Sequence, residues 1–263
     1  MQPNLTIIAI TQDCSHERHQ NIFRLAALIV EKLKHKFNVT LHIVADIDLK
    51  THHTEFVGHY NPSLWSNHIN EIAVIASANH LAASKKGVYS SNNQWKKVIL
   101  SMLNTTPTLF PERVLSRAEL EIACKHYLAL MLSSQLQTMS LIVEDDALPS
   151  DRSLAMLEQC LTNIYSSFDS YSSSYFIDMC CYPSIVDLGI PRNILAVTRT
   201  LCAYLVSPLS AALLVKHFLP FAIPVDMHVQ YLLKLLAHPG VLISRDDCFW
   251  NGSLTGSYTS GIS

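Results

Sequence analysis

The sequence predicts an α/β fold in which helices flank a mixed, mostly parallel sheet. A short apolar run at Leu5–Ile10, an amphipathic stretch at Glu17–Phe37 and a second apolar run at Leu41–Asp46 form a β-α-β opening. Such an opening favours parallel strands joined by a right-handed crossover. Short apolar runs and helical patterns then keep alternating toward the C-terminus. Ligands of such sheets bind beyond the carboxyl ends of the strands, where Asp13 and Asp46 fall.

The later elements are indicated by caps, periodicity and helix stops. Ser116 and Glu119 form a capping box ahead of a helical pattern, and that helix leads into the strand that ends in acidic residues. Ser207 is placed to cap a helix, and Pro220 to stop it. The other expected segments are a helix from near Pro149, strands at Tyr175–Met179 and Leu201–Val206, a loop at Ser166–Ser174, a helix at Pro208–Phe218 and a last helix from Asp226 to Leu236.

Length and composition indicate a globular chain with a large core. The 263 residues are 49% hydrophobic, which is ample for a substantial apolar interior. A net charge of −2 and an isoelectric point near 6.7 give no broad basic field, so nucleic acid is not an expected partner. The seven cysteines lack a metal-type Cys-x-x-Cys pattern, and we expect them to be reduced core residues.

The sequence shows neither an export signal nor a membrane-spanning segment. It has no run of eighteen or more apolar residues and no basic N-terminal stretch followed by a long apolar one, so we expect a cytoplasmic protein. The mean hydropathy of +0.21 is high. A large core and a face that binds a membrane surface or a partner explain this value equally well, and peripheral membrane association stays open.

The most informative segment is Leu141–Asp146, where a buried-strand run ends in three consecutive acids. Carboxylates held together repel one another until a hard cation such as Mg²⁺ or Mn²⁺ bridges them to a phosphate. Side chains alternate along a strand, so Glu144 and Asp146 are expected on one face and Asp145 on the other. In the alternative interpretation, Asp145 and Asp146 only cap the helix that begins near Pro149.

Further polar residues can be interpreted in two ways. Asp226 is placed as the N-cap of the last helix, and a carboxylate in that position can also act as a general base when it lies in a cleft. His126 falls off the apolar stripe of its helix, which favours a surface histidine over a ligand-binding one. The remaining histidines between residues 50 and 70 favour a solvated loop over a zinc site, and we assign no role to His52, His53, His59 and His68.

The order and spacing of several motifs resemble glycosyltransferase family 25, which includes bacterial lipopolysaccharide glycosyltransferases and collagen galactosyltransferases. The likeness spans roughly residues 110 to 262. It rests on the helix at Glu119–Leu130, on the acidic motif, on the stretch Thr198–Ser207 and on Pro224-Val-Asp226. The closing segment from Asn251-Gly-Ser also resembles the family, against the alternative of a disordered tail. Where many members have a Ser-His pair this chain has Lys125-His126, and Arg18 is the one arginine where the family often has two.

The resemblance implies one domain over residues 1–263 with a GT-A fold, a Rossmann-type domain that binds nucleotide sugars. Its N-terminal βα part would be 1–110, and 111–263 would hold the acidic motif and the acceptor side. By resemblance, Asp146 is a direct ligand of Mn²⁺ or Mg²⁺ and Glu144 contacts the metal or a ribose. Asp145 either supports the metal ligands from behind or contacts the donor sugar.

The resemblance also implies roles for three residues outside the acidic motif. Asp226 would be the catalytic base. His228 would complete the metal shell, although a neutral surface histidine is the plainer interpretation. Arg199 would bind a donor phosphate, with an ordinary surface ion pair as its alternative.

Together these features predict a metal-dependent inverting glycosyltransferase. It would move a hexose, galactose or glucose, from a uridine diphosphate (UDP) sugar to a glycan or glycolipid acceptor of the cell envelope, such as lipopolysaccharide. It would be cytoplasmic or peripheral at the inner membrane. Two alternatives remain. One is a Mg²⁺-dependent phosphohydrolase that uses the same acids on water, and the other is a noncatalytic subunit with the same fold.

Overall fold

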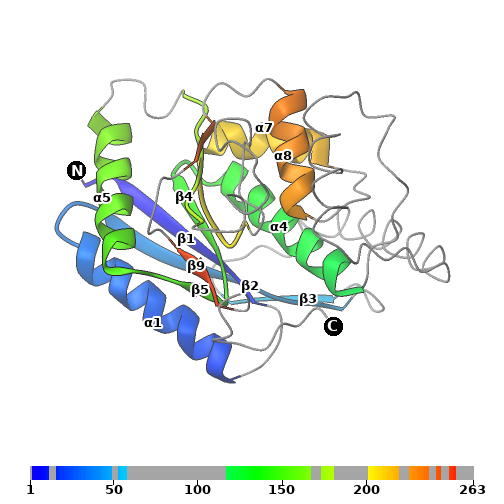
Figure 1. The fold of residues 1–263 in the computed structure, drawn as a ribbon, viewed down its shortest axis with the longest axis horizontal. Helices are drawn as coiled ribbons and strands as arrows, with labels where there is room; N and C mark the ends of the chain where they lie inside the picture. The colour runs from blue at the N-terminus through cyan, green and yellow to red at the C-terminus, as the bar shows by residue number, and fades with distance from the viewer. Residues whose placement is uncertain are drawn as a thin grey trace, which may run out of the picture.

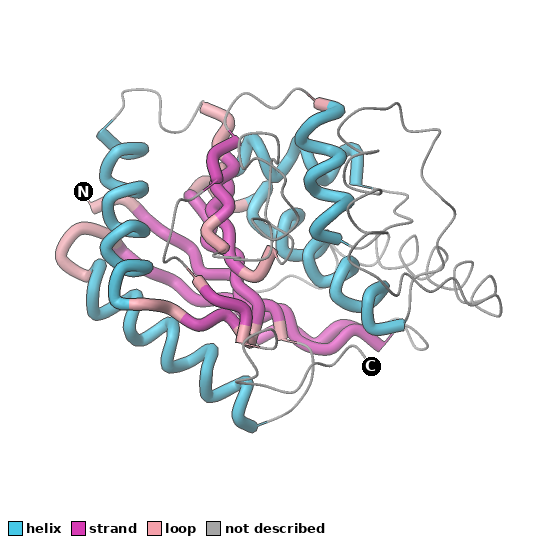
Figure 2. Tube along the Cα trace, in the orientation of Figure 1, coloured by secondary structure: helices cyan, strands magenta, loops and turns pink. Residues whose placement is uncertain are grey.

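The chain folds as an α/β protein with a mixed sheet between two layers of helices (Figures 1 and 2). This is a computed structural model. It describes residues 2–11, 16–48, 53–57, 117–166, 173–180, 201–218, 225–236, 241–243 and 249–252.

The element bounds follow the predicted alternation. The helices are α1 (His16–Leu33), α4 (Arg117–Gln135), α5 (Asp151–Ser166), α7 (Pro208–Phe218) and α8 (Val225–Leu235). The strands of the main sheet are β1 (Asn4–Ile10), β2 (Asn38–Asp48), β3 (His53–Val57), β4 (Met139–Glu144), β6 (Phe176–Asp178), β7 (Ala203–Val206) and β8 (Val241–Ile243). A second small sheet pairs β5 (Ala147–Leu148) with β9 (Trp250–Asn251).

The strand order of the main sheet is β3-β2-β1-β4-β7-β6-β8. From β1 the chain first builds outward through β2 and β3, and then returns to place β4 against the other side of β1. The strand order therefore reverses between β1 and β4, and the carboxyl ends of two parallel strands flank a crevice at such a reversal. Ligands of open α/β sheets bind at this point.

The prediction of a mixed, mostly parallel sheet is confirmed, because β1, β2, β4, β6 and β8 run in one direction and, of the seven strands described, only β3 and β7 run in the other. β1 runs parallel to β2 and β4, and β6 runs parallel to β8. The pairs β2/β3, β4/β7 and β6/β7 are antiparallel. Strands buried on both faces have the same apolar pattern in either direction, so the composition of β7 could not reveal its orientation.

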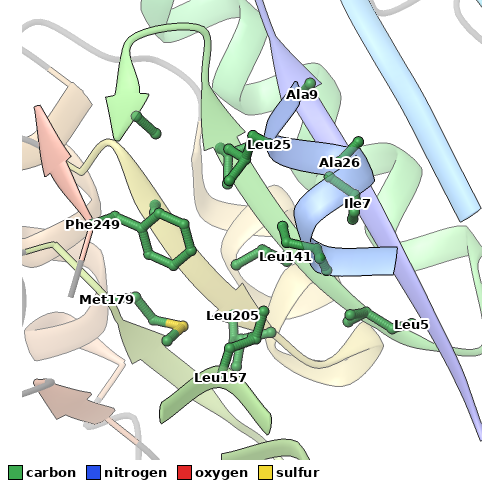
Figure 3. Close-up of a cluster of buried hydrophobic side chains, with 14 of the residues drawn as sticks. Leu5, Ile7, Ala9, Leu25, Ala26, Leu141, Leu157, Met179, Leu205 and Phe249 are labelled. Carbon is green, nitrogen blue, oxygen red and sulfur yellow. The ribbon is translucent and has the colours of Figure 1, made fainter. Parts of the chain in front are cut away.

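Each face of the sheet packs against its own layer of helices. On one face, α1 and α5 cover a cluster that includes Leu25, Leu157 and Leu141 (Figure 3). On the other face, α4, α7 and α8 enclose a second cluster, in which the rings of Tyr127 and Phe218 lie 5.3 Å apart. Two filled cores on opposite faces hold the sheet rigid, and this fixes the strand ends that carry the acidic motif.

Helix α4 is buried around most of its circumference. Every residue from 123 to 133 is buried, because the helix lies between the sheet and the helices α7 and α8. A helix enclosed in this way has no solvent face. The predicted apolar stripe was therefore too narrow, and polar residues of α4 lie in the interior.

Most element predictions agree with the structure, with corrections at the ends. The first helix ends at Leu33, four residues before the predicted Phe37, and the short strands β3, β5, β8 and β9 were not predicted. The Oγ of Ser207 accepts a hydrogen bond from the amide of Ser210 at 3.3 Å, which confirms the predicted cap of α7. Three cysteines of the described ranges are buried and form no disulfide, as expected for reduced core residues: Cys124, Cys180 and Cys202. None of the helices in the described ranges is both long and apolar enough to cross a membrane.

Candidate active site

The acidic motif lies at the point where the strand order reverses. Glu144 is the last residue of β4 and is in register with Ile10, the last residue of β1. Asp145 and Asp146 form a turn, and β5 follows directly. The three acids therefore stand at the adjacent carboxyl ends of two parallel strands, which is where open α/β sheets generally bind their ligands.

The acids do not cap the following helix. Helix α5 begins at Asp151, and its cap is Ser150, whose Oγ accepts from the amide of Ser153 at 3.1 Å. The amide of Ser150 in turn donates to the Oγ of Ser153 at 2.6 Å. This reciprocal arrangement satisfies two backbone donors. The alternative in which Asp145 and Asp146 serve as helix caps is therefore wrong.

Asp145 is tied to the α1 side of the sheet. Its Oδ1 accepts a hydrogen bond from Nη1 of Arg18 at 2.8 Å, and its Oδ2 accepts one from Oγ1 of Thr11 at 3.0 Å. Its backbone carbonyl accepts from the side-chain amide of Asn21 at 2.9 Å, and the same amide reaches the carbonyl of Ala147 at 3.2 Å. Both carboxylate oxygens of Asp145 are thus engaged within the protein.

A buried lysine ties the end of β1 to the same network. The Nζ of Lys125 donates to the carbonyl of Thr11 at 2.6 Å, and the side chain is 1% exposed. Lys125 belongs to α4, whereas Arg18 belongs to α1. The turn at Asp145 is therefore held from both helical layers, with Arg18 placed to neutralise the carboxylate.

Glu144 faces the opposite layer. Its Oε1 lies 3.0 Å from Nε2 of His126, and the Nδ1 of that histidine lies 3.0 Å from the hydroxyl of Tyr204. The rings of His126 and Tyr204 are stacked with centroids 5.7 Å apart. His126 is fully buried, so the prediction of a surface histidine is wrong. It faces inward because α4 has no solvent side at this point.

Burial shifts the pKa values of Glu144 and His126 in opposite directions. The pKa of Glu144 is raised well above its usual value by burial first, and then by the negative charges of Asp146, Asp145 and Asp226. Arg18 opposes that rise. Burial lowers the pKa of His126 to about 3. The contact between the two is therefore a hydrogen bond to a neutral imidazole, and it brings no positive charge to Glu144.

Asp146 is held by the C-terminal strand. Its carbonyl accepts from the amide of Gly252 at 2.8 Å, and its Oδ1 lies 3.5 Å from the side-chain amide of Asn251. Residues 250–252 are thus ordered against the acidic turn, and the alternative of a disordered tail is wrong for them. Residues 253–263 lie outside the described residues.

Asp226 approaches the site from the α8 side. Helix α8 begins at Val225, so Asp226 lies in its first turn and not at the predicted N-cap. A carboxylate there still meets the positive end of the helix dipole. Its negative charge contributes to the raised pKa of Glu144, which places Asp226 within electrostatic reach of the acidic motif.

One ring nitrogen of His228 is engaged within the core. The residue is buried, so the interpretation as a surface histidine is wrong. Its Nε2 lies 2.7 Å from the carbonyl of Phe218, and a carbonyl can only accept, so Nε2 carries the proton and has no lone pair for a metal. Burial lowers the pKa of His228 to about 4, although the carbonyl contact opposes that shift.

Backbone strain occurs next to the acidic strand end. Leu201 is fully buried and has φ of 43°, in the left-handed region that side chains with a Cβ disfavour. The next residue, Cys202, accepts a hydrogen bond from the amide of Glu144 at 2.8 Å. The strained residue thus sets the path of the chain that flanks Glu144, and such strain is concentrated at functional sites.

Some predicted residues lie outside the described residues, namely Arg199, Asp13, His52, His59 and His68. Three residues that contact the acidic motif or its neighbours, Asn21, Lys125 and Tyr204, were not predicted as site residues from the sequence. Asn21 interrupts the apolar stripe of α1, and that break was an available signal for a buried amide. Lys125 and Tyr204 gave no such signal, because their roles depend on which strand lies opposite them.

The side chains of Glu144 and Asp146 have the chemistry that binds a hard divalent cation, although the described residues do not form a complete set of ligands around one point. Glu144 and Asp146 supply carboxylate oxygens, the ligand type that Mg²⁺ and Mn²⁺ prefer. A cation would also offset the repulsion that raises the pKa of Glu144. Within the described ranges, no three side chains of His, Cys, Asp or Glu are already grouped closely enough to hold a metal ion.

Comparison with known proteins adds no further assignment. No family model matches the chain, and no curated protein matches it.

Proposed function

We propose that this protein is a metal-dependent inverting glycosyltransferase with a GT-A-like fold. It would transfer a hexose, galactose or glucose, from a UDP-sugar to a cell-envelope glycan such as lipopolysaccharide. The observation that carries the proposal is the position of the acidic turn at the carboxyl ends of β1 and β4, where the strand order reverses. Nucleotides bind at this point in open α/β sheets.

Two of the acids are suited to holding the cation. One carboxylate oxygen of Glu144 is hydrogen-bonded to His126, and Asp146 lies two residues further on, in the turn. A bound Mn²⁺ or Mg²⁺ would stabilise the charge that develops on the departing diphosphate. Asp145 is a poorer candidate for donor contact than the resemblance implies, since Arg18 and Thr11 already occupy its oxygens. We assign it to holding the turn.

Asp226 is the proposed base on the acceptor side. Inversion requires a group that removes the proton of the acceptor hydroxyl while that oxygen attacks the face opposite the leaving group. Asp226 lies on the α8 side of the sheet, whereas Asp145 is bonded to Arg18 on the α1 side. The side chain of Asp226 is only partly buried. It can therefore meet an acceptor while the acidic turn holds the donor.

The direct test measures donor binding and sugar transfer with and without Mn²⁺. A donor present at a hundred times its Kd should add about 2.7 kcal/mol to the free energy of unfolding. We expect that gain to require both Mn²⁺ and one UDP-hexose. Asp146→Asn and Glu144→Gln should abolish transfer while the protein stays folded. Glu31→Gln is the matched control, since it removes one charge from an exposed residue of α1 and should keep full activity.

Three results would contradict the proposal. Full transfer by Asp146→Asn without metal would exclude the cation site. Release of phosphate with no acceptor sugar present would instead favour the phosphohydrolase. Donor binding without any turnover would leave a noncatalytic subunit.

A further inference from the structure

We propose that His126, held in place by Tyr204, is a positioning residue that fixes the Glu144 carboxylate for the divalent cation. This inference rests on the proposed function and deepens it. It assigns a role to the hydrogen-bonded row Tyr204–His126–Glu144, which links β7, α4 and β4 beneath the acidic turn. No such role was predicted for His126 from the sequence.

The hydrogen bonds of the row have one arrangement that leaves Glu144 ionised. A neutral imidazole donates from one nitrogen and accepts at the other. If the Tyr204 hydroxyl donates to Nδ1, then Nε2 donates to Oε1 of Glu144, and both ring nitrogens of His126 are satisfied. The tautomer is thus set by the partner on the far side of the ring, as it is for many metal-site histidines.

The side chains of His126 and Tyr204 are packed too tightly to change rotamer. His126 and Tyr204 are both fully buried. The ring of Tyr204 is stacked between two others: its centroid lies 5.7 Å from that of His126 and 5.1 Å from that of Phe176, with interplanar angles of 20° and 22°. Moving the imidazole would therefore require opening the core between α4 and the sheet, which close packing resists.

One carboxylate oxygen of Glu144 is held, and the other remains for a ligand. Across the described part of the chain, the bond from His126 is the only hydrogen bond to the Glu144 side chain. That side chain is 15% exposed, whereas His126 behind it is inaccessible. A carboxylate anchored on its buried side and accessible on the other is preorganised as a metal ligand. Loss of such an outer partner typically weakens metal binding about 10–100-fold.

A plain structural role is the competing explanation, and two amide substitutions separate it from positioning. In His126→Gln the side-chain N–H can take the place of Nε2 and reach Glu144. In His126→Asn the shorter amide can take the place of Nδ1 and reach Tyr204, but it leaves Glu144 without its anchor. Both variants replace the imidazole with a neutral buried amide, so a structural role predicts similar effects of the two.

The experiment titrates each folded protein with Mn²⁺ alone and measures the free ion by electron paramagnetic resonance. We expect His126→Asn to raise the Kd for Mn²⁺ about 10–100-fold, and His126→Gln to stay close to wild type. Tyr204→Phe removes only one hydroxyl and should also weaken binding, which keeps the test decisive if His126→Asn does not fold. Equal affinity in wild type, His126→Asn and Tyr204→Phe would overturn the positioning role. Failure of the wild type itself to bind Mn²⁺ would instead overturn the metal site of the proposed function, and the positioning role with it.

Discussion

Glu144 and Asp145 are consecutive carboxylates, yet the two layers of the molecule surround them with opposite chemistry. On the α1 side, Asp145 meets the guanidinium of Arg18 and the hydroxyl of Thr11. On the α4 side, Glu144 meets a neutral histidine and the charges of other acids. The carboxylate of Asp145 is neutralised by Arg18, whereas that of Glu144 has no such positive partner among the described residues. This difference indicates that Asp145 holds the turn and that Glu144 is available to bind a cation.

The largest expected difference between the two is in stability. Asp145→Asn leaves Arg18 without its carboxylate partner, and breaking a largely buried ion pair costs about 3 kcal/mol. Glu144→Gln should cost less than about 1 kcal/mol, because it removes a carboxylate whose neighbours are mostly acids and keeps an amide that can bond to His126. Urea unfolding of both variants measures the contrast. Equal losses would show that the two carboxylates are held alike.

The pH dependence of folding should come mainly from the α4 and α8 side. Burial keeps His126 and His228 neutral in the folded state, with pKa values of about 3 and about 4. Between pH 6.5 and these values each of the two histidines binds more protons in the unfolded chain than in the folded one, so its contribution to stability falls as the pH falls. Each histidine contributes up to about 1.4 kcal/mol per pH unit.

Unfolding free energies measured between pH 7 and pH 4 test this prediction. His228→Gln should flatten the acid limb of the curve. His35→Gln, which changes an exposed histidine after α1, should leave the curve as it is. An unchanged acid limb in His228→Gln would show that this histidine is already protonated or exposed in the folded protein.

On the α1 side, Asn21 should act as a structural anchor of the acidic turn. Its side-chain amide donates to the carbonyls of Asp145 and Ala147. Asn21→Ala leaves two carbonyls without that donor, and we expect a loss of about 2 kcal/mol in thermal or urea unfolding. Arg24→Ala, at an exposed position of the same helix, should change stability by less than about 0.5 kcal/mol. Similar losses in both variants would mean that the amide of Asn21 adds nothing specific.

The smallest expected effect separates stability from cation binding. Thr11→Val keeps the shape of the side chain and removes only the hydroxyl that donates to Asp145. Because Arg18 remains, we expect a loss of about 1.5 kcal/mol in stability and an unchanged Kd for Mn²⁺ in the same titration. A weaker Kd would show that the Asp145 side also shapes the cation site.

The fold could be predicted where local pattern determines structure. β1, β4 and α7 follow from apolar runs, caps and helix stops. The direction of β7 could not be predicted, because a strand buried on both faces has the same pattern in either direction. The two-residue strands β5 and β9 have no periodicity to detect, and they form only because the acidic turn and the C-terminal segment meet.

The candidate site was predicted in part for the same reason. The acidic motif was identifiable because three consecutive acids at a strand end are unusual. The burial of His126 was not, since helical periodicity assumes a solvent face that α4 lacks. The partners Arg18, Thr11 and Tyr204 come from other elements, and only the strand order brings them to the acids.

The most direct measurement of the central claim is anomalous X-ray scattering from crystals soaked with Mn²⁺ and UDP. We expect a manganese peak within bonding distance of carboxylate oxygens of Asp146 and Glu144, with the diphosphate on the other side of the ion and Asp145 still bonded to Arg18. A peak elsewhere, or no peak while UDP is bound, would contradict the claim that this acidic turn holds the donor through a cation.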